Sequence, residues 1–289
     1  GPPARPSYNV GRLYPDAAGD ACDVTGPSTV NDQVLGMSDD GTRVLAAVCE
    51  PTGRTKKVRL VDLSNRTTIY EVGTYVTDEG YALSGDGLTV AWTQSQFDGT
   101  YRINRVRLPD TAPTFFTVAD PTTAANGHRI VLSDNGVRVA YRTVSGSQRQ
   151  YALCAPGVDD ASSCVGAPTV NINADLAGAA QLSGDGETLA VAVKASPPAA
   201  PSVPSTADRV MVYDRVGATL VERASIAAAV VDPALSDDGN TLAIAQNDGV
   251  TLGIVRRNVA DPTVFDAPTP IERSEEHTSE LQSLAYLVC

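Results

Sequence analysis

One short turn constrains this chain more than any other feature. It is a Ser-x-[Asp/Asn]-Gly tetrapeptide with apolar residues on both sides, and it occurs five times. The serines follow one another at intervals of 46, 49, 50 and 53 residues. Self-similarity at such a period is typical of blade or solenoid arrays, in which each repeat is one supersecondary unit. The copies are Ser38-Asp39-Asp40-Gly41, Ser84-Gly85-Asp86-Gly87, Ser133-Asp134-Asn135-Gly136, Ser183-Gly184-Asp185-Gly186 and Ser236-Asp237-Asp238-Gly239.

The residues of the turn have a local explanation. Asp or Asn followed by Gly tolerates positive φ at two successive positions, as a tight hairpin that matches the strand twist requires. The serine hydroxyl can hydrogen-bond the backbone of the turn. We therefore expect a structural role for Ser38, Asp40, Gly41, Ser84, Asp86, Gly87, Ser133, Asn135, Gly136, Ser183, Asp185, Gly186, Ser236, Asp238 and Gly239.

Four strands are predicted around each turn. In the first unit they are residues 33–37, 42–48, 57–63 and 68–72, and the third of these alternates strictly, which indicates a half-buried strand. The second strands of the units are apolar without alternation, which indicates burial on both faces. The sequence therefore predicts an all-β chain, a β-propeller of four-stranded antiparallel blades, with about five blades in residues 31–272. The last predicted strand is 263–265.

The two ends of the chain differ from the repeats. Residues 273–289 resemble the in-frame translation of a sequencing adapter, and we exclude them as a non-native tail. The alternative is a native amphipathic tail. Residues 1–30 are rich in Pro, Gly and Asp, and we interpret them as a linker or a stray outer strand. Because a sixth turn would fall inside the tail, we expect an incomplete propeller whose parent has roughly six to eight blades.

The charge of the chain limits its partners. The formal net charge is −12, and the only lysines are Lys56, Lys57 and Lys194. Nucleic acids and anionic membrane surfaces attract clustered cations, so neither is an expected partner. No stretch approaches the ~18 consecutive apolar residues of a membrane-spanning helix, and we expect no membrane insertion.

The cysteines suggest an oxidising compartment. Without Cys289 of the tail, an even number remains, and possible disulfides are Cys154 with Cys164, and Cys22 with Cys49 by elimination. The first pair brackets a loop that would join two antiparallel strands. Buried reduced thiols are the alternative, because spacing alone does not establish a disulfide. An extracellular or periplasmic location is the corresponding expectation.

A search for catalytic or metal-binding motifs assigns no residue. The chain has no Cys-x-x-Cys, His-Glu-x-x-His, P-loop or Gly-x-Ser-x-Gly motif, and His128 is the only histidine outside the tail. Calcium at the turn carboxylates is an alternative, but the spacing of an EF-hand loop is missing. The carboxylates considered for it are Asp39, Asp40, Asp237 and Asp238. We therefore expect no catalytic residue, cofactor or metal site. A Pro/Ser/Ala-rich insert, residues 195–205, is either an inert surface loop or a binding element.

The repeat unit resembles the WD40-like (PD40) repeat of TolB-type β-propeller proteins over about residues 31–266. The resemblance lies in the Ser-x-Asp-Gly turn between apolar strands and in third strands such as 58–63 and 210–214. It departs from the family at the second turn position, where this chain has Asp or Gly in place of Pro. The resemblance implies a non-enzymatic scaffold whose loops bind another protein or an extracellular ligand. The alternative is the gating propeller of a prolyl-oligopeptidase-like hydrolase, with the catalytic domain elsewhere.

Overall fold

The computed structural model describes twelve segments of the 289-residue chain. These segments consist of β-strands and turns, and no helix among them is long and apolar enough to cross a membrane. The described residues are 33–49, 56–75, 80–96, 100–119, 130–145, 148–154, 169–172, 180–193, 209–217, 219–228, 233–245 and 252–271.

The strands form five antiparallel sheets of four strands each, so the predicted fold class is confirmed. Blade 1 consists of β1 (Gln33–Met37), β2 (Arg43–Cys49), β3 (Lys56–Asp62) and β4 (Thr67–Thr74), and blade 2 of β5 (Tyr81–Leu83), β6 (Thr89–Ser95), β7 (Thr100–Arg107) and β8 (Thr114–Ala119). Blade 3 consists of β9 (Ile130–Leu132), β10 (Val139–Ser145), β11 (Gln148–Cys154) and β12 (Thr169–Ile172). Blade 4 consists of β13 (Ala180–Leu182), β14 (Thr188–Val193), β15 (Arg209–Val216) and β16 (Thr219–Ala227), and blade 5 of β17 (Ala234–Leu235), β18 (Thr241–Ala245), β19 (Leu252–Arg256) and β20 (Thr269–Pro270).

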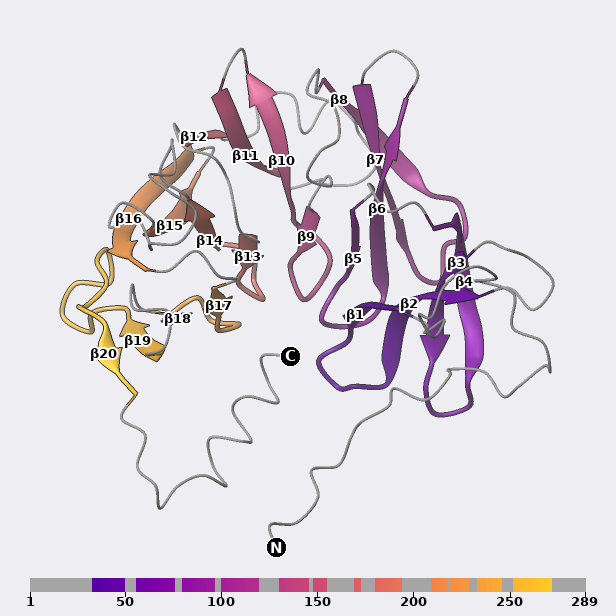
Figure 1. The fold of residues 1–289 in the computed structure, drawn as a ribbon, viewed down its shortest axis with the longest axis horizontal. Coiled ribbons are helices and arrows are strands. Elements are labelled where there is room, and N and C mark those ends of the chain that lie inside the picture. Colours follow the sequence, from indigo (N-terminus) through magenta and orange to yellow (C-terminus); the bar gives the residue numbers. More distant parts are fainter. Residues whose placement is uncertain are drawn as a thin grey trace, which may run out of the picture.

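The blades follow one another around an arc in chain order (Figure 1). Their first strands contact each other in sequence, from β1 to β5, β9, β13 and β17, and so form the inner side of the arc. The fourth strands lie on the outer side. Each sheet keeps its four strands in chain order, and hydrogen bonds join only successive strands.

The core lies between the blades because each inner sheet is buried on both faces. β14 shows this most clearly, since all six of its side chains are buried. Its small alanines, Ala190 and Ala192, are fully buried and allow the neighbouring sheet to approach closely. The prediction that the apolar second strands are buried on both faces is confirmed for β14, whereas in β18 Thr241 and Ala243 are only half-buried.

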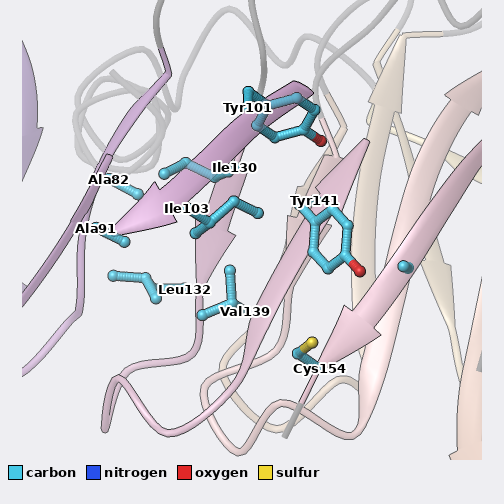
Figure 2. Packing of buried hydrophobic residues seen from close by; sticks show 10 residues of the cluster. Ala82, Ala91, Tyr101, Ile103, Ile130, Leu132, Val139, Tyr141 and Cys154 are labelled. Atoms are coloured by element: carbon cyan, nitrogen blue, oxygen red, sulfur yellow. The ribbon is translucent and has the colours of Figure 1, made fainter. Parts of the chain in front are cut away.

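Figure 2 shows the core between blades 2 and 3. Ile103 of β7 packs with Ile130 of β9 and Val139 of β10, and Tyr141 and Cys154 lie beside them. Equivalent clusters of buried residues lie between blades 1 and 2, 3 and 4, and 4 and 5. The Tyr101 hydroxyl, in the same cluster as Ile103, donates a hydrogen bond across the interface to the carbonyl oxygen of Arg142.

The predicted last strand, residues 263–265, is wrong. Phe265 forms only an isolated bridge with Arg257, and the fourth strand of blade 5 is β20. The Oδ1 atom of Asn258 accepts hydrogen bonds from the backbone of Ala260 and Asp261. These bonds close a tight loop and so delay the return of the chain to the sheet.

Several predictions concern residues outside the described ones. They are the linker 1–30, the insert 195–205, the tail 273–289, His128, Cys22 and Cys164, together with the side chain of Cys49. Cys154 is fully buried and disulfide-bonded. The two cysteine pairings therefore stay predictions.

Candidate functional site

The five Ser-x-[Asp/Asn]-Gly turns lie next to one another along the arc, each between the first and second strand of its blade. Backbone hydrogen bonds link the turns of successive blades. The amide of Asp39 donates to the carbonyl of Gly85 at 2.9 Å, and the amide of Asp134 donates to the carbonyl of Gly184 at 2.9 Å. The amide of Gly184 in turn donates to the carbonyl of Asp237 at 2.8 Å. We call this ring of turns the axial face.

The backbone of the turn differs from the prediction. In every copy only the glycine has positive φ, between 64° and 74°, and its amide donates to the carbonyl of the turn serine. Among the described residues the one non-glycine with positive φ is Arg66, so positive φ at two successive turn positions was the wrong expectation. The third residue of the turn acts instead through its side chain.

The serine and the third residue close the turn together. The Ser183 hydroxyl donates to Oδ1 of Asp185 at 2.7 Å and accepts from the amide of Thr188 at 2.9 Å. The same Oδ1 atom accepts from the amide of Glu187 at 2.9 Å. Equivalent bonds occur in the other four turns, with Asn135 in place of aspartate in blade 3. These bonds lie at the residues for which the sequence predicts a structural role, and that role stays a prediction.

The second turn position alternates around the axial face between aspartate and glycine. Asp39, Asp134 and Asp237 occupy it in blades 1, 3 and 5, and Gly85 and Gly184 occupy it in blades 2 and 4. The two glycines leave room for the carboxylate of the preceding blade. A Cβ atom at Gly85 would lie 2.1 Å from Oδ2 of Asp39, and one at Gly184 would lie 1.9 Å from Oδ2 of Asp134.

The three second-position carboxylates affect one another. Burial together with the charges of Asp39 and Asp237 raises the pKa of Asp134 to about 6. Burial and the charge of Asp237 likewise raise the pKa of Asp39 above its ordinary value. Asp39 and Asp237 are exposed and Asp134 is half-buried. The axial face therefore presents concentrated negative charge to solvent.

The third-position carboxylates behave in the opposite way. The hydrogen bond from Ser38, followed by the bonds from Thr42, holds the pKa of Asp40 below its ordinary value. Burial would raise the pKa of Asp86, but hydrogen bonds from Ser84 and Leu88 and the Arg107 guanidinium lower it overall. These carboxylates are already satisfied within the turns. Among the described residues, the second-position carboxylates differ in that they accept no such bonds within their turns.

Arginines connect the turns across the blade interfaces. Arg43 of blade 1 donates to the carbonyl of Gly87 at 3.0 Å, and Arg107 of blade 2 donates to the carbonyl of Asn135 at 2.7 Å. Arg138 of blade 3 pairs with Glu187 of blade 4. The guanidinium groups of these arginines thus contact backbone or carboxylate acceptors of the following blade.

The sequence indicated only part of this site. Asp39 and Asp237 were considered as calcium ligands, whereas Asp134 was recognised only as a turn residue. The signal for Asp134 is the Asp/Gly alternation at the second turn position, read across all five repeats. Within the described residues, no group of three or more His, Cys, Asp and Glu side chains is arranged to hold a metal ion.

The chain is similar to known proteins in its three-dimensional structure. No protein-family model matches the chain, and no curated protein sequence matches it. The β-propeller domain of the Trilobed protease from Pyrococcus furiosus, which has an open velcro topology, matches with a TM-score of 0.53 at 8% identity. That match covers 86% of this chain and 72% of the other.

Two further solved structures are similar. A prolyl endopeptidase structure matches with a TM-score of 0.50 at 14% identity, covering 89% of this chain and 37% of the other. TolB from Acinetobacter baumannii matches with a TM-score of 0.48 at 15% identity, and this chain covers 54% of its length. At these identities the matches to the Trilobed protease domain and the prolyl endopeptidase show the β-propeller fold alone.

Proposed function

We propose that this chain is a non-enzymatic binding propeller whose axial face contacts a positively charged group of another protein or an extracellular ligand. The observation that carries the proposal is the convergence of Asp39, Asp134 and Asp237 from three blades. None of the three carboxylates has a side-chain hydrogen bond or an ion pair with the described residues. A cationic group placed between them would reduce their mutual repulsion.

The geometry favours recognition over catalysis. The serine hydroxyls of the turns are consumed by the turn carboxylates and strand amides, and Ser84, Ser133 and Ser183 are fully buried. A nucleophile needs an adjacent base and access to substrate. These serines are buried, so the described part of the axial face gives them no access to substrate. What it does offer is fixed negative charge on a rigid ring, which supports specificity for a cationic partner.

The test uses an octalysine peptide as a cationic probe. Its affinity for the purified chain is measured by fluorescence anisotropy at pH 7.5 and low salt. The triple variant Asp39→Asn, Asp134→Asn, Asp237→Asn removes the axial charge and leaves side chains of nearly the same size. Loss of about 1.4 kcal/mol of binding free energy would weaken the complex about tenfold, and we expect at least that loss.

The matched control removes the same number of charges from exposed positions outside the five turns. It is Asp110→Asn, Glu222→Gln, Asp266→Asn, all three at exposed residues. We expect the control to weaken binding by less than a factor of about two, because screened surface charges contribute little. Equal weakening by both triple variants would mean that the probe reads only net charge, and would refute the axial face as the contact surface.

The proposed location and the excluded partners are inferred from the amino-acid sequence. We propose an extracellular or periplasmic setting, supported by the even number of cysteines outside the tail 273–289, and no nucleic-acid or membrane partner because of the net charge of −12. The absence of enzymatic activity is tested by incubating the chain with generic ester and peptide substrates, from which we expect no turnover. A gating role beside a hydrolase domain would require a catalytic domain outside this sequence.

A further inference from the structure

One face of each blade points toward the blade that follows it in the chain. In blades 3 and 4 the side chains on this face are buried. In blade 3 the face carries Ala140 of β10 and Leu153 and Tyr151 of β11, which are exposed by 0%, 1% and 1%. The equivalent residues of blade 4 are Ala190, Val212 and Val210, at 0%, 0% and 1%. These side chains form the interblade cores described above.

Blade 5 has the same kind of apolar face, but there the side chains are partly exposed to solvent. Ala243 pairs with Ile254 as Ala140 pairs with Leu153, so the two faces correspond in register. Ala243 and Ile254 are only half-buried, and Leu252 is 54% exposed. An apolar surface that forms an interface in the preceding blades is therefore partly exposed to solvent in blade 5.

Blade 1, at the other end of the arc, has no such exposed apolar face among its described residues. On the face of blade 1 that points away from blade 2, Val44, Ala46, Val48 and Val61 are exposed by 3% or less. The two end blades are therefore not equivalent. The described apolar face that lacks cover is the one on blade 5.

The axial face indicates what can cover it. Asp39 and Asp134 each lie over the second-position glycine of the next blade, where any Cβ atom would collide with the carboxylate. Asp237 of blade 5 has the same turn position, and the described residues include no following blade with a second-position glycine beside it. A partner at this face must therefore leave room for the Asp237 carboxylate.

We propose that the open face of blade 5 is an interface for one further blade, a four-stranded antiparallel sheet whose first turn reads Ser-Gly-Asp-Gly. Blade 4 is the model for this occupant, because it packs on blade 3, which matches blade 5 in its turn aspartate and its apolar face. A second copy of this chain fits poorly. Its blade 1 would bring Asp39, with its own side chain and negative charge, to the position where Asp237 requires a glycine.

The test supplies such a blade covalently. Residues 173–228, which contain blade 4 and the segment before it, are appended after residue 272 in place of the tail 273–289. We expect the extended chain to unfold at a higher temperature than the chain without the extra blade. It should also bind less of the dye 8-anilinonaphthalene-1-sulfonate, because the exposed apolar face is covered.

The control is the same extension with Gly184→Asp in the appended copy only. The added side chain would collide with Asp237 and place two carboxylates together, so both gains should be lost. A second design appends blade 2, residues 76–119, whose turn also carries glycine at the second position. If neither extension changes the melting temperature or the dye binding, or if the aspartate control performs as well, the proposal is overturned.

The free chain provides an independent measurement. Size-exclusion chromatography with light scattering should give a monomer, because only a blade with glycine at the second turn position can pack on this face without colliding with Asp237. A dimer that Leu252→Lys converts to a monomer would show that a second copy covers the face, and would refute the proposal.

Discussion

The guanidinium of Arg257 in blade 5 holds the carboxylate of Asp214 in blade 4 by two hydrogen bonds, Nη1 to Oδ2 at 2.7 Å and Nη2 to Oδ1 at 2.8 Å. The same guanidinium donates to the carbonyl of Pro262 at 2.8 Å and lies 4.6 Å from the ring centroid of Phe265. A two-pronged arginine–carboxylate pair fixes orientation as well as distance. Arg257 therefore anchors blade 5 to blade 4.

We expect Arg257→Lys to destabilise the protein, because an ammonium group cannot form the two parallel bonds. The loss should be about 2 kcal/mol of unfolding free energy, measured by urea denaturation. Burial would raise the pKa of Asp214, but Arg257 holds it below its ordinary value of 3.8. The stabilisation is therefore complete above that value and disappears as the pH falls below it. A wild-type stability curve without this acid-dependent component would contradict the assignment.

Ser183→Ala should destabilise the chain more than substitution of an exposed serine. Ser183 is fully buried, and its loss would leave the buried amide of Thr188 without its hydroxyl acceptor. An unpaired buried amide costs about 1–3 kcal/mol, which thermal unfolding would detect. Ser64→Ala is the matched control, because Ser64 donates a similar bond to Asp62 at 2.5 Å but is exposed. Equal effects of the two substitutions would show that burial of the turn serine is unimportant.

The difference between local and distant contacts decides how much the sequence predicts. The hairpin around each turn follows from residues within five positions, such as the bonds among Ser183, Asp185 and Thr188, and it was predicted. The role of Asp134 depends on Gly184, fifty residues later, which no local pattern reveals. The fourth strand of blade 5 was misplaced because the side-chain bonds of Asn258 close a loop where the composition resembles a strand.

Gly184→Ala should destabilise the interface between blades 3 and 4. The new Cβ atom would lie 1.9 Å from Oδ2 of Asp134 and 3.1 Å from Cβ of Asp237, so the carboxylate must move. We expect a loss of about 1–2 kcal/mol in unfolding free energy. Combining it with Asp134→Ser should restore most of the loss, since the shorter side chain vacates the space. Without such recovery, the close approach would not be the cause.

Asp134→Asn should stabilise the protein at neutral pH and have little effect in acid. The pKa of Asp134 in the folded chain is raised to about 6 from 3.8. The folded state then binds the proton more tightly than the unfolded state, so stability falls as the pH rises from about 4 to 6 and stays lower above it. The neutral asparagine avoids this loss. The melting temperature of the variant should therefore equal that of the wild type near pH 4 and exceed it increasingly as the pH rises toward 8.

Asp40→Asn provides the control for that pH profile. Asp40 has a lowered pKa because it accepts bonds from Ser38 and Thr42, and asparagine occupies the same position naturally as Asn135. This variant should show no gain at neutral pH. A gain of the same size in both variants would attribute the effect to net charge and not to the second-position carboxylates.

Asn104→Leu should raise stability, because the Nδ2 atom of Asn104 is buried without a hydrogen-bond partner in the described structure. Asn104 lies opposite Trp92 in the β6–β7 pair. The same place holds Ala152, Met211 and Gly253 in blades 3, 4 and 5, and Arg59 in blade 1. Leucine has nearly the shape of asparagine and removes the unpaired donor. We expect a gain of about 1 kcal/mol in urea denaturation. Asn104→Ala, which also removes the amide but leaves a cavity, should gain less or lose stability. A loss with leucine would instead show that the amide of Asn104 is satisfied in solution, by a bound water or another acceptor between blades 1 and 2.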